Sequence, residues 1–313
     1  MNHSKIAIII VNYKTPQLTL DCLDSIEMNS VNFPVKIFLV DNHSDDNSLL
    51  LFKNYIQIER TIPIELIASP ENNGFAAGNN LAIQKAKQED FDYFILLNSD
   101  TLISPDILNH LNTFLSENPD CDIVACCVNN KQQQCEHTVT RARPTFWNLI
   151  FLYQSPFWNK TWFPGYKKHF MMNKNKDMSF SVFTGNAACM LLKKDFFIKT
   201  GLLDENTFLF FEEFIIGEKA KNFQMNVCYM PKPGILHYGG ESTKKARAFS
   251  YIEFCKSEKY YMRNYRNFGW LKISTAKIFR TTGFLLRSLR NKEYRSNVKK
   301  FFKEYLFSEN STI

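Results

Sequence analysis

Four short apolar segments, each followed by polar residues, alternate with helix-like segments over the first 130 residues of this chain. The segments Ile6–Tyr13, Val35–Val40, Ile64–Ala68 and Tyr93–Leu97 have the length and composition of strands. A run that is apolar throughout is typical of a strand covered on both faces. Because such strands alternate here with helical patterns, the sequence predicts a parallel α/β sheet with helices on both sides.

The polar residues that follow these strands indicate where a ligand would bind. Open parallel sheets bind ligands at the carboxyl ends of their strands. Asp41 ends the second strand, and its carboxylate could accept hydrogen bonds from a ribose hydroxyl or a base N–H, or could serve only as a cap. Asn98-Ser99-Asp100 ends the fourth. Asp100 could hold Mg²⁺ or Mn²⁺, which take few protein carboxylates, or could simply begin a turn.

A glycine-containing segment, Asn72–Asn80, spans the start of the helix expected at Phe75–Lys87. Small residues at a helix start let a phosphate-bearing ligand approach the backbone N–H groups. The segment lacks G-K-[ST], and no G-x-G-x-x-G follows the first strand. ATP hydrolysis and NAD binding are therefore disfavoured.

Two later segments carry further candidates for catalysis. Glu212 and Glu213 follow a hydrophobic run and are placed for general-base work, although acidic residues also favour a first helical turn. Adjacent helical residues diverge, so only one of the two can face a given site. His237 lies in a glycine-containing loop, where it could ligate a metal, contact a phosphate or be structural.

The remaining features of the sequence concern the location of the chain, the state of its cysteines and the organisation of its later segments. Its 313 residues contain no apolar run near the ~18 that a membrane span needs and no signal-peptide core, so a cytoplasmic location is expected. The 8 Cys show neither C-x-x-C nor zinc-finger spacing, which favours reduced thiols. Residues 131–178 break the pattern and are expected to form an insertion or flap, and residues from Ser250 onward read as helices.

Positive charge is concentrated near the end of the chain. Residues 244–303 hold 17 Lys and Arg against 3 Asp and Glu, a local +14, while the whole chain carries +7 and the remainder therefore −7. Such a tail could face nucleic acid, anionic lipid or an acidic substrate. The acidic remainder and its clustered acidic motifs argue against nucleic acid.

Motifs along the chain, taken in order, resemble family 2 glycosyltransferases of GT-A fold, especially the rhamnosyltransferase-like, polysaccharide-assembling branch. The resemblance covers about residues 5–245 and rests on Val11-Asn12-Tyr13, Val40-Asp41-Asn42-x-Ser44, Asn73–Asn80, Leu96–Thr101, and the late Glu-Glu and His-Tyr-Gly-Gly-x-Ser segments. It implies a Rossmann-like nucleotide-binding sheet with a C-terminal helical extension. We expect a GT-A domain over 1–245, with a nucleotide-binding half over 1–130, the flap over 131–178 and an acceptor half over 179–245. The basic helical extension would then cover 246–313.

The resemblance also implies an activity and its residues. The family transfers a sugar, with inversion, from a nucleoside diphosphate to an acceptor hydroxyl. The implied nucleoside contacts are Asn12, Tyr13 and Asp41, with Asn73 and Asn79 near them. Asp100 would bind the divalent cation, and Glu213 would be the base, with Glu212 the runner-up. From its own loop, His237 is our candidate for a second metal ligand.

Two departures and one alternative accompany this interpretation. The family's D-x-D motif is Asn98-Ser99-Asp100 here, and its Glu-Asp pair is Glu212-Glu213. The Q-x-x-R-W motif and membrane spans of the processive synthases are absent, which favours addition of a single sugar. The resemblance implies that this sugar is a hexose or deoxyhexose and that it is added in surface polysaccharide assembly. The acceptor could be a lipid-linked saccharide and the basic tail could lie on an anionic membrane.

The alternative function, that of a nucleotidyltransferase, would need a basic glycine-rich loop where residues 12–16 read Asn-Tyr-Lys-Thr-Pro.

Overall fold

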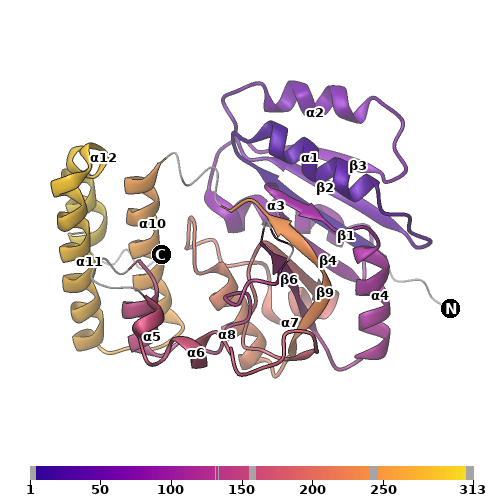
Figure 1. Ribbon diagram of the computed structural model, residues 1–313. Coiled ribbons are helices and arrows are strands. Elements are labelled where there is room, and N and C mark those ends of the chain that lie inside the picture. Colours follow the sequence, from indigo (N-terminus) through magenta and orange to yellow (C-terminus); the bar gives the residue numbers. More distant parts are fainter. Residues whose placement is uncertain (1–4, 131, 133, 155–159, 240–245, 308–313) are drawn as a thin grey trace.

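The computed structural model describes residues 5–130, 132, 134–154, 160–239 and 246–307. Within these residues a sheet of nine strands forms the centre of the larger part of the chain (Figure 1). The strands are β1 (Ile6–Asn12), β2 (Val35–Asp41), β3 (Ile64–Ala68), β4 (Tyr93–Asn98), β5 (Thr101–Ile103), β6 (Ile123–Asn129), β7 (Phe180–Ser181), β8 (Cys189–Lys193) and β9 (Val227–His237). Their order is β3-β2-β1-β4-β8-β6-β9-β5, and β7 pairs with β9.

The first four strands in that order are parallel, as the sequence predicts. β1 pairs in parallel with both β2 and β4, and β2 pairs in parallel with β3. The register places Asn12 opposite Asp41, and Val11 opposite Asn98. The polar ends of three strands therefore meet at one edge of the sheet, where the sequence predicts the ligand site.

Helices cover both faces of this sheet. They are α1 (Pro16–Glu27), α2 (Ser48–Ile56), α3 (Gly74–Lys87), α4 (Ile107–Glu117), α7 (Lys194–Thr200) and α8 (Glu212–Asn222). Alternate residues of β1 belong to different cores: Ile8 packs with α1, α2 and α4, whereas Ile9 packs with α3, α7 and α8. This two-sided burial explains why β1 is apolar throughout.

A third core joins the C-terminal helices to the segment expected as a flap. It contains residues of α10 (Arg247–Asn264), α11 (Trp270–Arg290), α12 (Lys292–Ser296), α13 (Val298–Phe301) and the final π-helical turn Phe302–Leu306. It also contains Phe146, Leu149 and Ile150 of α5 (Phe146–Leu152). The middle segment, which continues with η1 (Lys160–Trp162) and α6 (Tyr166–His169), is thus packed at α5 rather than free. The domain boundaries stay a prediction.

Two further observations complete the fold. Among the described residues, none of the helices has the length and apolar character needed to cross a membrane. All 8 cysteines are free thiols, and only Cys135 and Cys228 are not fully buried.

Figure 1 shows α10 between the sheet and α11, so that α11 lies on the outside of the molecule.

Candidate active site

A pocket of about 420 Å³ opens at the carboxyl edge of the parallel strands, and we call it the strand-end pocket. Its wall is built from the ends of β1, β4 and β9, the start of α3, the start of α8 and the first residues around α10. Five of the residues predicted from the sequence line it: Tyr13, Asp100, Glu212, Glu213 and His237. Helix α8 begins at Glu212, so both glutamates lie in its first turn and in this wall.

Asn12 and Asp41 lie beneath the pocket rather than in its lining. Both side chains are buried, and the Asn12 Nδ2 donates to Asp41 Oδ1 at 2.8 Å. The other Asp41 oxygen accepts from the Ser44 backbone N–H at 3.0 Å. The Asn12 Oδ1 accepts from the Thr19 hydroxyl at 2.9 Å. These bonds tie the end of β1 to the loop after β2, so the two residues shape the pocket floor.

Asn42, which the sequence analysis did not single out, lines the strand-end pocket. Its side-chain Nδ2 donates to Asn72 Oδ1 at 2.9 Å and to the Gly74 carbonyl at 3.2 Å. The buried Oδ1 has no hydrogen-bond partner among the described residues. A buried acceptor without a partner is costly, so it is suited to receive a ligand N–H or O–H. Side-chain alternation at the end of β2 could have identified it, because neighbours of Asp41 face the opposite side.

Asn73 and Asn79 are also outside the strand-end pocket lining. Asn73 precedes α3, donates to Glu71 Oε1 at 2.7 Å, and lines a separate cavity beside Phe208. Asn79 is buried and donates to the Phe75 carbonyl at 2.8 Å inside α3. Between them, Gly74 has φ of +91°, and a Cβ there would meet the Phe208 carbonyl oxygen at 2.2 Å. Only glycine allows this close approach of the two pocket walls.

The candidate metal ligands Asp100 and His237 are brought together by two neighbouring strands. β5 and β9 are antiparallel, with Thr101 opposite His237. The His237 Nε2 lies 3.1 Å from Asp100 Oδ1 and 3.4 Å from Asn98 Nδ2. Within the described part of the chain no group of three or more His, Cys, Asp or Glu could hold a metal ion. The residues of the loop after Gly239 that the sequence analysis named, Gly240–Lys245, lie outside the described residues.

Glu213 is fixed by two contacts that the sequence does not reveal. Its carboxylate Oε1 forms an ion pair with the Arg141 guanidinium. Its backbone carbonyl accepts from the Thr184 hydroxyl at 2.7 Å. Thr184 and Arg141 are in turn joined through their backbones, since the Arg141 N–H donates to the Thr184 carbonyl at 3.0 Å. Arg141, Thr184 and Glu213 thus form a closed ring of contacts, and the Glu213 carboxylate has a defined position in the pocket wall.

Glu212 has the opposite electrostatic environment from its neighbour. Burial, with a smaller contribution from the negative charge of Glu213, raises the pKa of the Glu212 carboxyl to about 8. Its Oε1 is buried without a partner within the described part of the chain. Arg141, by contrast, has its pKa raised by the charge of Glu213 despite the opposing effect of burial. At neutral pH the Glu212 carboxyl therefore keeps its proton, beside Glu213, which is paired with the Arg141 guanidinium.

Comparison with known proteins identifies relatives with one kind of activity. Residues 7–189 match the sequence profile of "Glycosyl transferase family 2". An uncharacterized glycosyltransferase of Haemophilus influenzae is 30% identical over 122 residues, which are 38% of this chain and 45% of that protein. This chain thus spans less than half the length of that relative. The N-acetylglucosaminyl-diphospho-decaprenol L-rhamnosyltransferase of Mycobacterium tuberculosis is 20% identical over 76% of this chain and 77% of its own length.

Solved structures of the same fold align with nearly the whole chain. A mannosyltransferase from Pyrobaculum calidifontis, in complex with GDP-Man and Mn²⁺, aligns with 98% of this chain and 82% of its own at a TM-score of 0.57 and 12% identity. Residues 1–349 of TarS from S. aureus, in complex with UDP-GlcNAc, align with 96% of this chain and 81% of their own at a TM-score of 0.53 and 15% identity. At these identities the likeness shows the fold, which is the GT-A fold predicted from the sequence.

Proposed function

Because the chain belongs to glycosyl transferase family 2, a glycosyltransferase family, we propose that it moves one sugar, with inversion, from a nucleoside diphosphate to a hydroxyl of a saccharide acceptor. The observation that carries this proposal is the composition of the strand-end pocket. One wall presents Asp100 and His237, and another presents the fixed carboxylate Glu213. A pocket of about 420 Å³ has room for a ligand of the size of a nucleotide sugar's reacting half.

We assign the general base to Glu213. A base must be unprotonated to accept the acceptor's hydroxyl proton, and Glu212, with a pKa of about 8, holds its own proton at neutral pH. The Glu213 Oε1 is the carboxylate oxygen that pairs with the Arg141 guanidinium, and Glu213 lines the strand-end pocket. In the reaction the proton moves to Glu213 while the acceptor oxygen forms a bond to C1 of the sugar. The bond from C1 to the diphosphate oxygen breaks, and the nucleoside diphosphate leaves.

A divalent cation, Mg²⁺ or Mn²⁺, fits the residues at the opposite wall. Asp100 would offer a carboxylate oxygen, which suits Mg²⁺ and Mn²⁺, and His237 would offer an imidazole nitrogen beside it. In the structure the His237 Nε2 and the Asp100 Oδ1 lie within hydrogen-bond distance, 3.1 Å apart, so both would be within reach of one ion bound at this wall. When bound, such an ion supplies positive charge for the diphosphate leaving group. With only these two protein ligands, the remaining positions would be open to diphosphate oxygens and water.

We place the nucleoside along the β1 and β2 ends of the pocket. Tyr13 and Asn42 line that part, and the partnerless Asn42 Oδ1 is suited to accept a hydrogen bond from a base N–H. Asn12 and Asp41 would act indirectly, by holding the two strand ends together. The role of Asn73 and Asn79 would likewise be to shape the start of α3, since both side chains bond within their own segment.

The acceptor we propose is a lipid-linked saccharide in surface polysaccharide assembly at the inner face of the cell membrane. The Mycobacterium tuberculosis relative is named for a sugar acceptor on a decaprenyl diphosphate, and the match covers 76% of this chain. The basic helical tail that follows the pocket supports a site of action close to an anionic surface.

The test is to offer the purified chain a panel of nucleotide sugars with Mn²⁺ and short-chain lipid diphosphate saccharides. We expect one acceptor to gain the mass of one sugar residue, with release of one nucleoside diphosphate. The anomeric configuration of the product, read by NMR, should be opposite to that of the donor. Release of pyrophosphate from a nucleoside triphosphate and a sugar phosphate, with no sugar transfer, would instead identify a nucleotidyltransferase.

A further inference from the structure

The outer side of α11 carries a stripe of apolar side chains that are exposed in the described chain. Leu271, Ile278, Leu285 and Leu289 are all exposed, and their spacing of seven, seven and four residues places them on one face of the helix. Trp270 and Leu286 extend the same exposed surface. Exposed apolar residues scattered singly are ordinary, whereas a continuous stripe marks an interaction site.

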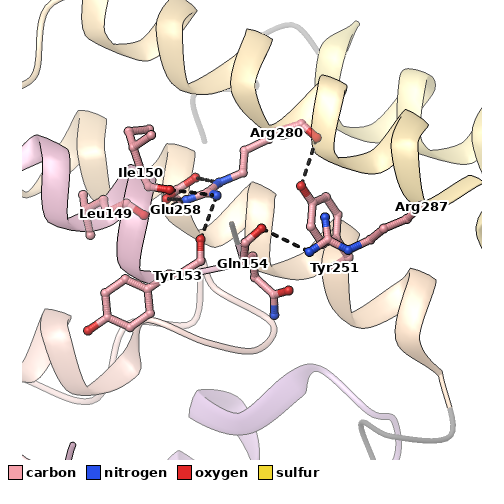
Figure 2. A network of polar contacts seen from close by, with 8 residues as sticks. All are labelled: Leu149, Ile150, Tyr153, Gln154, Tyr251, Glu258, Arg280 and Arg287. Atoms are coloured by element: carbon pink, nitrogen blue, oxygen red, sulfur yellow. Dashed lines mark hydrogen bonds and ion pairs between the residues drawn. The ribbon is translucent and has the colours of Figure 1, made fainter. Parts of the chain in front are cut away.

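The inner side of α11 is fixed by a buried ion pair, shown in Figure 2. The Arg280 guanidinium donates to both Glu258 carboxylate oxygens, at 2.7 and 2.6 Å, and neither side chain is exposed. It also donates to the Leu149 carbonyl at 2.7 Å and the Tyr153 carbonyl at 2.8 Å, at the end of α5. Arg280 thereby fastens α11 to α10 and α5. The outer stripe is presented by a rigid unit rather than by a frayed helix.

The three described tryptophans lie in the same part of the molecule. Trp147, Trp162 and Trp270 are 53%, 79% and 74% exposed. A chain of ring contacts leads from α5 and η1 to α11. Phe151 is its centre: it stacks on Trp147 at 5.5 Å, and it contacts Phe279 of α11 and Phe163, which follows Trp162, at 5.9 and 5.3 Å. Exposed tryptophans on an apolar surface are typical of side chains that enter the headgroup region of a membrane.

The charge around the stripe has one sign. Besides Arg280, which is buried on the inner side and paired with Glu258, the sequence of α11 contains four Lys and Arg and no Asp or Glu. Lys272 and Arg290 are exposed and lie on the same flank of the stripe, because 18 residues make five whole turns. Exposed cations beside an apolar stripe complement an anionic surface.

We propose that the stripe of α11 together with Trp147 and Trp162, which we call the outer face, docks on an anionic lipid membrane. A second copy of the chain is the weaker fit, because a symmetric contact would bring the two acid-free α11 helices together. Docking does not depend on catalysis, but its purpose rests on the proposed function. Ala246, Phe249 and Ser250 line the strand-end pocket at the start of α10, the helix to which Arg280 fastens the outer face. Docking would therefore hold the pocket at a fixed position relative to a lipid-linked acceptor.

The experiment uses the intact chain and two matched triple variants. One carries Leu271→Ser, Ile278→Ser and Leu289→Ser in the outer face. The control carries Leu50→Ser, Ile58→Ser and Ile198→Ser, whose side chains are 62%, 61% and 62% exposed but lie on or beside α2 and α7. Each protein is sedimented with vesicles of phosphatidylcholine alone or mixed with phosphatidylglycerol, at low and at high salt, and tryptophan emission is recorded.

The intact chain and the control should bind the anionic vesicles, shift their tryptophan emission to the blue and lose binding at high salt. The outer-face variant should bind about tenfold more weakly or worse. Equal binding by both triple variants, equal binding to neutral vesicles, or no binding by the intact chain would overturn the proposal. A dimer in solution that only the outer-face variant dissolves would assign the surface to a second copy instead. Transfer to a water-soluble acceptor, measured in parallel, separates failure of docking from failure of the proposed reaction.

Discussion

The guanidinium of Arg141 holds the carboxylate of Glu213 in the wall of the strand-end pocket, with side chains that are only 13% and 14% exposed. The two residues are 72 positions apart in sequence and are joined a second time through Thr184. The pair gives Glu213 a fixed position and a permanent positive neighbour. Glu212, one residue away, has no such partner and keeps its proton.

Replacement of Arg141 should therefore slow the reaction without abolishing donor binding. We expect Arg141→Ala to lower kcat about 100-fold, because a base displaced by about 1 Å loses that much, while the KM for the donor changes little. Arg141→Lys should recover part of the loss. Arg143→Lys is the matched control, since Arg143 pairs with Glu218 outside the pocket lining. A folded Arg141→Ala variant with unchanged kcat would contradict this role.

The raised pKa of Glu212 predicts a pH dependence of stability. Between pH 4.5 and about 8 the unfolded chain releases the Glu212 proton while the folded chain keeps it. The free energy of unfolding should therefore fall as the pH rises through this range and level off above it. Glu212→Gln removes the effect, so urea unfolding at pH 6 and 9 should show a smaller loss in the variant than in the native chain. Equal losses in both proteins would show that Glu212 is not buried as a neutral acid.

The metal proposal predicts a specific loss of diphosphate binding. Asp100→Ala should abolish the part of nucleoside diphosphate binding that depends on Mn²⁺, and His237→Ala should weaken it, both measured by calorimetry with and without the ion. Asp90→Ala removes an exposed carboxylate outside the pocket and should bind like the native chain. Undiminished Mn²⁺-dependent binding by Asp100→Ala, or full transfer in excess chelator, would contradict the assignment.

The ion pair between Arg280 and Glu258 should dominate the stability of the C-terminal helices. Arg280→Met leaves Glu258 buried without its partner, so we expect a loss of about 3–5 kcal/mol in the free energy of unfolding. Arg290→Met, on the exposed side of α11, should stay within about 0.5 kcal/mol. A double variant, Arg280→Met with Glu258→Leu, should recover part of the loss because no buried charge remains. Similar unfolding curves for both single variants would show that the pair is not essential.

Much of the fold over residues 1–130 could be predicted because its signals are local. The apolar runs of β1, β2, β3 and β4 and the Pro16 at the start of α1 mark elements that the structure contains at nearly the same positions. The edge on which their polar ends meet follows from parallel pairing alone. Which side chain of each polar end enters the pocket does not follow. Asn42, rather than Asp41, faces it, and that depends on the pleat at the last residue of β2.

The contacts around Glu213 could not be predicted because they join distant segments. Arg141 comes from the middle segment, whose sequence has no clear periodicity, and its backbone is placed by a bridge to Thr184. The packing of α5 could not be predicted for a similar reason, because Leu149 and Ile150 are buried only where α10 and α11 cover them. The sequence also indicated a basic tail. It did not indicate that the face of α11 that carries Arg280 is buried while the opposite face is exposed.

The assignment of the base is tested most directly by comparing Glu213→Gln with Glu212→Gln in the same transfer assay. Donor binding and single-turnover transfer are measured at neutral pH, with the donor and acceptor that the panel identifies. Glu213→Gln should bind the donor but transfer about 10²–10⁴-fold more slowly, because an amide cannot accept the proton. Glu212→Gln should remain active, because its amide resembles the protonated acid already present. An active Glu213→Gln beside an inactive Glu212→Gln would contradict the account and move the base to Glu212.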